Sequence, residues 1–177
     1  MKKFVLAPAL AALVMFFWGF IYYGVSGIPY RALEDSSSLA AVVSALPADG
    51  TYITPDPRGS EEAMAEAMKA GPFAMVHFRK IPEAMGPIMI KGYLHEFVCC
   101  LLVVVLLVRC QSSLDTFGCR LMFVFVIGLL IALFSHGSAA IWWQQGWAWN
   151  LMMMLYDVVA WLLAGLVLAK LVAPKAA

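Results

Sequence analysis

Residues 121–140 read LMFVFVIGLLIALFSHGSAA, and His136 is the only ionisable side chain among them. The hydrocarbon core of a bilayer is about 30 Å thick, which a helix of about 20 mainly apolar residues can cross. This stretch therefore predicts a transmembrane helix. Three further windows have the same character: Phe4–Val25, Ile88–Val108 and Trp149–Ala169. The chain is thus predicted to be an all-α membrane protein, a bundle of four transmembrane helices.

The composition of the whole chain indicates that lipid is its solvent. Hydrophobic residues make up 63% of the 177 residues and charged residues only 13%, whereas soluble domains average about 45–50% apolar and about 25% charged residues. A water-soluble fold of this size buries about 70% of its surface, too little to conceal so much apolar area. The net charge of +1 gives no support for a nucleic-acid partner.

The first window could be read as a secretory signal peptide, because Lys2 and Lys3 precede it and 25–27 resembles a small-residue cleavage site. Its apolar stretch is longer than the usual core of about 7–15 residues. Its outer half, 16–23, is bulky and aromatic rather than small. We therefore expect residues 1–26 to form an uncleaved transmembrane anchor.

The basic residues predict the orientation of the chain in the membrane. They fall before the first helix, around the turn 110–119 and after the fourth helix: Lys2, Lys3, Arg109, Arg120, Lys170 and Lys175. The hairpin 137–148 has no Lys or Arg. Since cytoplasmic loops are enriched in Lys and Arg, both termini are predicted to be cytoplasmic, in the cell (inner) membrane. Residues 27–87 then lie outside, and 88–177 hold helices two to four with a cytoplasmic C-terminus.

The predicted outer segment, 27–87, alternates short helix and strand patterns. Ser36–Ser38 read as caps of a helix from Leu39, and Ser60 reads as the cap of a second helix. Thr51–Thr54 and Phe73–Phe78 are β-like runs. None of the four cysteines lies within residues 27–87, and no two of them form a C-x-x-C pair. This indicates reduced thiols rather than disulfides. We expect a small α/β extracytoplasmic insert that rests on the helix bundle.

Sequence motifs of the common enzyme classes are absent from the chain. It has no P-loop, dinucleotide-binding fingerprint or nucleophile elbow. His95 and Glu96 begin an H-E pair, but Cys99 occupies the place of the second histidine of a zinc protease. The chain is therefore expected to be non-enzymatic.

Polar side chains inside the predicted helices form the candidate site, because such groups are costly in lipid and mark function by default. We define the polar layer as His95, Glu96, His136, Asp157, Tyr22 and Tyr23. With a rise of about 1.5 Å per residue, all six lie in the outer half of the membrane. We expect Asp157 to face the bundle interior and to pair with His136 or His95.

Three interpretations of the polar layer remain open. It could be a structural cluster that fixes helix register, a site that handles protons or a substrate, or a metal or haem site with His95 and His136 as ligands. The first is favoured, so no cofactor is expected, with haem or a transition metal as the alternative. The predicted function is an accessory or structural subunit that packs in the lipid bilayer against itself or other membrane proteins. The alternative is a membrane redox or transport protein.

Overall fold

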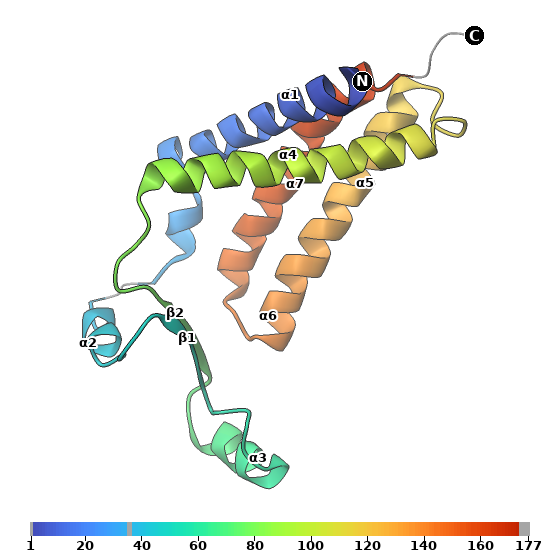
Figure 1. The fold of residues 1–177 in the computed structure, drawn as a ribbon. Coiled ribbons are helices and arrows are strands. Elements are labelled where there is room, and N and C mark those ends of the chain that lie inside the picture. Colours follow the sequence, from blue (N-terminus) through green and yellow to red (C-terminus); the bar gives the residue numbers. More distant parts are fainter. Residues whose placement is uncertain (1, 35–36, 174–177) are drawn as a thin grey trace. The chain divides into compact units, whose positions relative to one another are not determined.

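The computed structural model describes residues 2–34 and 37–173. The chain divides into two compact units: unit 1 comprises Met1–Leu33 and Ala84–Ala177, and unit 2 comprises Glu34–Glu83. Unit 1 is helical, whereas unit 2 contains both short helices and strands (Figure 1).

Four long helical segments make up unit 1. They are α1 (Lys2–Gly19) with the π-helix η1 (Phe20–Val25), α4 (Met85–Arg109), α5 (Phe117–Ala132) continued by the π-helix η3 (Leu133–Gly137) and α6 (Ser138–Trp142), and α7 (Trp147–Leu171). Each is long and apolar enough to cross a membrane. The structure thus confirms the four predicted apolar helices, and it extends α4 three residues before the predicted start at Ile88.

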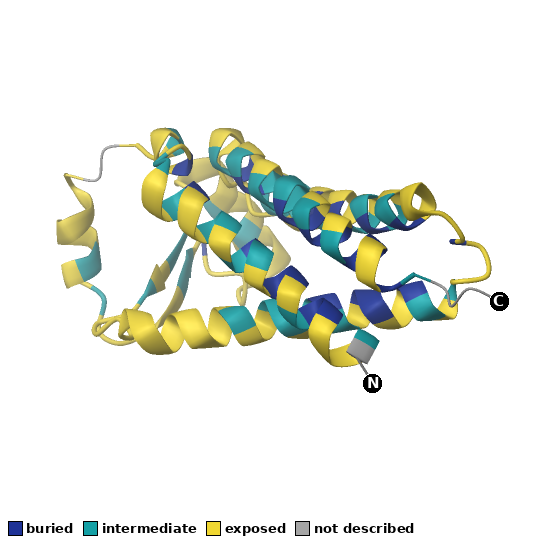
Figure 2. Ribbon diagram, turned by 90° about the horizontal axis from the view of Figure 1, so that it is seen from above, coloured by how far each residue is buried: buried dark blue, intermediate teal, exposed yellow. Residues whose placement is uncertain are grey.

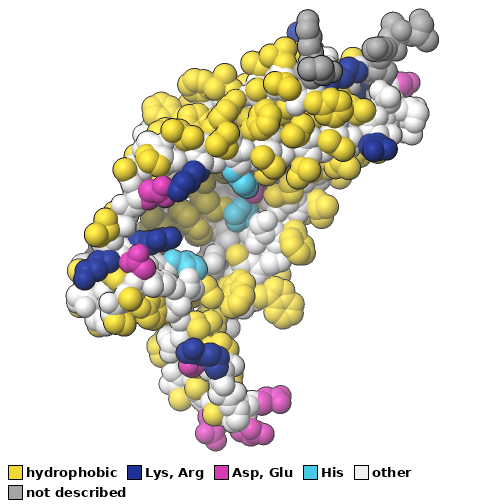
Figure 3. Space-filling model, viewed as in Figure 1, with side chains coloured by type: hydrophobic (Ala, Val, Ile, Leu, Met, Phe, Trp, Pro, Cys, Tyr) yellow, Lys and Arg dark blue, Asp and Glu magenta, His cyan; other side chains and the backbone are white. Residues whose placement is uncertain are grey.

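The four segments pack in the order α4, α1, α7, α5, so α1 and α7 occupy the middle. The buried positions of each helix lie on the side that faces its neighbours (Figure 2), and the visible outer surface is mainly hydrophobic (Figure 3). Small residues form much of the core, among them Ala11, Ala12 and Ala164. Small side chains let helix backbones approach closely where lipid supplies no hydrophobic driving force.

Glycines set the closest approach between α5 and α7. A Cβ built on Gly128 would lie 2.2 Å from Cβ of Trp161, so any side chain there would force the helices apart. Gly165 on α7 is similarly enclosed. A Cβ built on it would lie 3.1 Å from Leu121 Cδ1 and 3.3 Å from Val124 Cγ1. In contrast, a Cβ on Gly24 would meet only the side chain of Phe20, on its own helix.

Basic side chains gather at one end of unit 1, where they meet the C-terminal end of α7. Arg120 is only 6% exposed, and its guanidinium donates to the carbonyl oxygens of Ala169, Leu114 and Asp115 at 2.8–2.9 Å. Lys3 Nζ donates to the Ala173 carbonyl at 2.6 Å. Cations are favourable at a helix C-terminus, where carbonyl groups lack helical partners. Arg120, which the sequence suggested only as a loop charge, is therefore a buried packing residue.

Unit 2 contains a two-stranded antiparallel sheet and two short helices. Strand β1 (Gly50–Thr54) pairs with β2 (Ala74–Phe78), with Tyr52 opposite Val76. The helices are α2 (Leu39–Ser44) and α3 (Glu61–Ala70). These elements match the expected order of helix, strand, helix and strand.

The two helix caps predicted in unit 2 differ in outcome. The Ser60 side chain accepts a hydrogen bond from Ala63 N at 3.2 Å, which confirms it as the cap of α3. Ser38 precedes α2 without a side-chain capping bond, so that prediction was wrong for Ser38, and Ser36 lies outside the described residues. Among the described residues of unit 2, Pro55 alone is buried. The unit therefore has too little hydrophobic core to account for its own stability.

Candidate functional site

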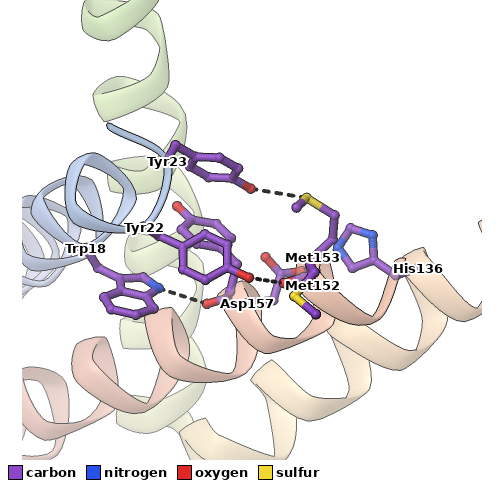
Figure 4. Close-up of polar contacts among 8 residues, drawn as sticks. Trp18, Tyr22, Tyr23, His136, Met152, Met153 and Asp157 are labelled. Carbon is purple, nitrogen blue, oxygen red and sulfur yellow. Dashed lines mark hydrogen bonds and ion pairs between the residues drawn. The ribbon is translucent and has the colours of Figure 1, made fainter. Parts of the chain in front are cut away.

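A histidine and an aspartate from neighbouring helices form the polar centre of unit 1. His136 Nε2 on η3 lies 3.0 Å from Asp157 Oδ2 on α7, and the side chains are 22% and 21% exposed (Figure 4). Of the two partners that the sequence suggested for Asp157, the structure therefore selects His136.

Four aromatic rings pack beside this pair. The ring of Tyr156 on α7 stacks on Trp18 at 6.5 Å and lies 5.5 Å from Tyr22 and 5.0 Å from Tyr23. Trp18 and Tyr22 also lie 5.4 Å apart. Tyr22 is only 2% exposed. The rings thus fill the space between α7 and the segment formed by α1 and η1. We call these four rings the aromatic cluster.

Two members of the aromatic cluster bond directly to the backbone of α7. Trp18 Nε1 donates to the Tyr156 carbonyl at 3.1 Å, and Tyr22 Oη donates to the Met152 carbonyl at 2.8 Å. The donors are four residues apart on one helix and the acceptors four residues apart on the other, which is about one helical turn on each. The two bonds therefore fix the register of α1 against α7. Tyr23 Oη points beside them to Met153 Sδ at 3.2 Å (Figure 4).

Both π-helices of the described chain carry residues of the polar layer. Tyr22 and Tyr23 lie in η1, and His136 lies in η3. A backbone bond from Ser26 N to the Ile21 carbonyl at 2.8 Å closes the last π turn of η1. π turns are rare in proteins, and those that occur are often found at functional sites. Because a π turn holds an extra residue, it rotates the side chains that follow, which aims these groups at α7.

Glu96 adds a carboxylate from α4 to the same region. It lies close enough to Tyr156 to interact with it electrostatically. Its Oε2 atom is enclosed and has no hydrogen-bond partner within the described part of the chain. A buried oxygen without a partner is costly, and its presence calls for a structural or functional reason. All four long helical segments thus contribute to the candidate site.

His95, the other histidine of the predicted polar layer, does not take part in this arrangement. Its side chain is exposed, and the contact found for it is Cys99 Sγ on the same helix, 3.7 Å from Nε2. Neighbouring positions on a helix point about 100° apart, so the inward position of Glu96 turns His95 outward. In residues 2–34 and 37–173 there is no group of three or more His, Cys, Asp and Glu side chains placed to hold a metal.

The sequence did not reveal two residues of the centre. Trp18 lies one turn before Tyr22, and this spacing was the available signal for a shared helix face. Tyr156 is adjacent to Asp157 in the sequence, and it contacts every other ring of the aromatic cluster. The predicted polar layer also omitted the buried Asn150 in the first turn of α7. Its side chain is 1% exposed and donates to the Gly146 carbonyl at 3.1 Å.

The chemistry available at this centre is hydrogen bonding and proton exchange. An imidazole and a carboxylate 3.0 Å apart can share or pass a proton, and the phenols of Tyr22 and Tyr23 can donate or accept. Comparison with known proteins assigns no activity to it: neither a protein-family model, nor a curated protein, nor a solved structure matches this chain.

Proposed function

We propose that this protein is a non-enzymatic, four-span membrane protein that serves as an accessory or structural subunit of a membrane assembly. The observation that carries the proposal is the pair of bonds from Trp18 and Tyr22 to carbonyls of α7. With the His136–Asp157 pair, these bonds satisfy polar groups inside the helices themselves. Such a network stabilises one helix arrangement, as expected for a protein whose task is to present a defined surface.

In this proposal the four helices form a bundle with both termini in the cytoplasm of the cell that makes the protein. The bond from Lys3 to Ala173 brings the start of α1 and the end of α7 together. Arg120 joins the turn after α4 to that same end. Basic residues favour the cytoplasmic side, so unit 2 is the extracytoplasmic part. Its thin core suits a segment that is completed by contact with a partner subunit.

The test compares two substitutions of Asp157. Asp157→Asn retains the shape and much of the hydrogen bonding to His136, whereas Asp157→Leu removes both. If the polar layer is structural, the Asn variant keeps near-normal thermal stability and assembly in detergent. The Leu variant loses about 1–3 kcal/mol, because His136 is left without its partner. Normal assembly of the Leu variant, or a visible absorbance band or stoichiometric metal in the purified protein, would overturn the proposal.

A second candidate is a membrane protein that moves protons or a substrate through the polar layer. It is favoured by the enclosed Glu96 Oε2, which has no hydrogen-bond partner among the described residues, and by the two π-helices at the centre. Here Glu96→Gln, which is nearly the same size, would assemble normally and abolish proton uptake into vesicles. Equal proton permeability of Glu96→Gln and wild-type vesicles would exclude it.

A further inference from the structure

A hollow of about 410 Å³ lies in unit 2, where strand β1 begins and strand β2 ends. Its volume is within the range of small-molecule sites, about 300–1,000 Å³. The subunit role proposed above makes no use of it. Six residues line the hollow, all of them from unit 2: Asp49, Gly50, Thr51, His77, Phe78 and Arg79.

The register of the two strands brings four polar side chains to one face of the sheet. Thr51 lies opposite His77 in the antiparallel pair. Asp49 and Arg79 come two residues further along the respective chains. Because residues two apart on an extended chain point to the same face, the four side chains share a face, and all four line the hollow.

Two of these side chains form an open ion pair. Arg79 Nη1 lies 3.6 Å from Asp49 Oδ2, which is longer than the distance of about 2.7–2.9 Å in a close charged hydrogen bond. The side chains are 79% and 48% exposed, and exposed pairs of this kind are weak. Asp49 Oδ1 accepts a hydrogen bond from Lys80 N at 2.7 Å, which holds the carboxylate in place. The hollow thus presents one positive and one negative charge to a ligand.

His77 supplies a third polar group with a fixed orientation. Its Nδ1 shares a hydrogen bond of 2.9 Å with Thr51 Oγ1. This bond fixes the plane of the ring, and Nε2 at the opposite edge can donate or accept according to the tautomer. The imidazole is therefore prepared for a further polar contact beside the two charges.

We propose that the hollow binds a free α-amino acid, with the ligand carboxylate on Arg79 and the ligand ammonium group on Asp49 Oδ2. A simple anion would meet the carboxylate of Asp49 and a simple cation the guanidinium of Arg79, so a ligand that carries both charges is favoured. In an α-amino acid both groups are attached to one carbon, a spacing that suits protein charges 3.6 Å apart.

The shape of the two protein groups supports this assignment. A guanidinium binds a carboxylate through two parallel hydrogen bonds, whereas the carboxylate of Asp49 accepts from an ammonium group. The rest of the hollow leaves room for the ligand side chain near His77. This site is independent of the subunit role, and each can hold without the other.

The first test titrates the full chain in detergent with glycine, the smallest α-amino acid. The chain has three histidines, so selective labelling gives an NMR signal for His77 and two internal references, His95 and His136. Glycine should shift the His77 signal saturably and leave the references in place. Acetate carries only the negative charge and methylamine only the positive one, so each should bind at least about tenfold more weakly. No saturable shift with glycine, or equal binding of either control compound, would overturn the proposal.

The second test removes the two charges one at a time. Arg79→Gln and Asp49→Asn should each raise the glycine dissociation constant at least about tenfold. Arg58→Gln is the matched control, because Arg58 is an exposed arginine of the same unit that pairs with Asp56 away from the hollow. It should leave the constant unchanged. The changes lie at exposed side chains, so the His77 signal before titration should match that of the wild type. Unchanged binding in the first two variants, or an equal loss in all three, would contradict the proposal.

Discussion

Single residues with no side chain decide how closely the helices pack, and Gly128 is the clearest case. Its contact is with Cβ of Trp161, an atom that a rotamer change cannot move away. Ala in that place would keep α5 apolar, so the effect is one of shape and not of hydrophobicity.

Gly128→Ala should therefore destabilise unit 1 by about 3 kcal/mol, at the upper end of the range for overpacking a core. The measurement is thermal unfolding in detergent. Gly118→Ala on the same helix is the control, since the nearest atom to its built Cβ is 4.0 Å away. A shift in the unfolding temperature no larger than that of the control would contradict the close approach.

In unit 2, a single arginine controls the charge of a neighbouring carboxylate. Arg58 donates to both carboxylate oxygens of Asp56 at 2.8 and 2.7 Å, and its backbone N–H donates to Oδ1. These hydrogen bonds lower the pKa of Asp56 to about 2. They hold the turn between β1 and α3.

The lowered pKa gives a sign for the pH dependence of this turn. The stabilisation is fully present above the ordinary pKa of about 4 and is lost as the pH falls from there through about 2. Carbon NMR titration of the Asp56 carboxyl in the full chain should give a midpoint near 2. In Arg58→Gln the midpoint should return towards the ordinary value. An unchanged midpoint in that variant would show that the pair does not form in solution.

At the scale of elements, the contact between α1 with η1 and α7 depends on directional bonds as well as packing. The bonds from Trp18 and Tyr22 reach carbonyls that already accept within α7, so they add register without unpairing the helix. The π turn of η1 directs the side chains of Tyr22 and the adjacent Tyr23 toward α7. There they bond to two successive residues, Met152 and Met153.

Tyr22→Phe should therefore cost about 1 kcal/mol of stability while leaving the ring packing in place. Combined with Trp18→Phe, the loss should differ from the sum of the two single effects, because both bonds fix the same register. Tyr30→Phe, at a ring that is 51% exposed, is the matched control. Strict additivity of the two substitutions, measured by denaturant titration in detergent, would show that they act independently.

At the scale of the whole molecule, the antiparallel contacts place three basic regions at one end of unit 1. The turn after α4 carries Cys110, and the exposed Cys119 lies at the start of α5. If that end is cytoplasmic, an impermeant thiol reagent should label both only after the cells are opened, and a reporter fused after residue 177 should be cytoplasmic. Labelling of either cysteine in sealed cells would reverse the orientation.

Much of this architecture follows from local composition. A window of about 20 apolar residues is a helix in lipid whatever its neighbours are, because a lipid-exposed backbone must satisfy its hydrogen bonds within the helix. The cap of α3 at Ser60 was predictable as well, because it follows from the local sequence. The strands β1 and β2 were visible as short apolar runs between turn residues.

The tertiary structure alone decided which faces meet. Membrane helices are apolar all round, so periodicity carries little information about the buried side, and the sequence could not show that Glu96 turns inward while His95 turns out. The choice of His136 over His95 as the partner of Asp157 follows from that rotation. So does the burial of Arg120, whose three acceptors come from two separate parts of the chain. Rotation about a helix axis is set by contacts between distant residues, and it changes the partners of every side chain without changing the composition of the helix.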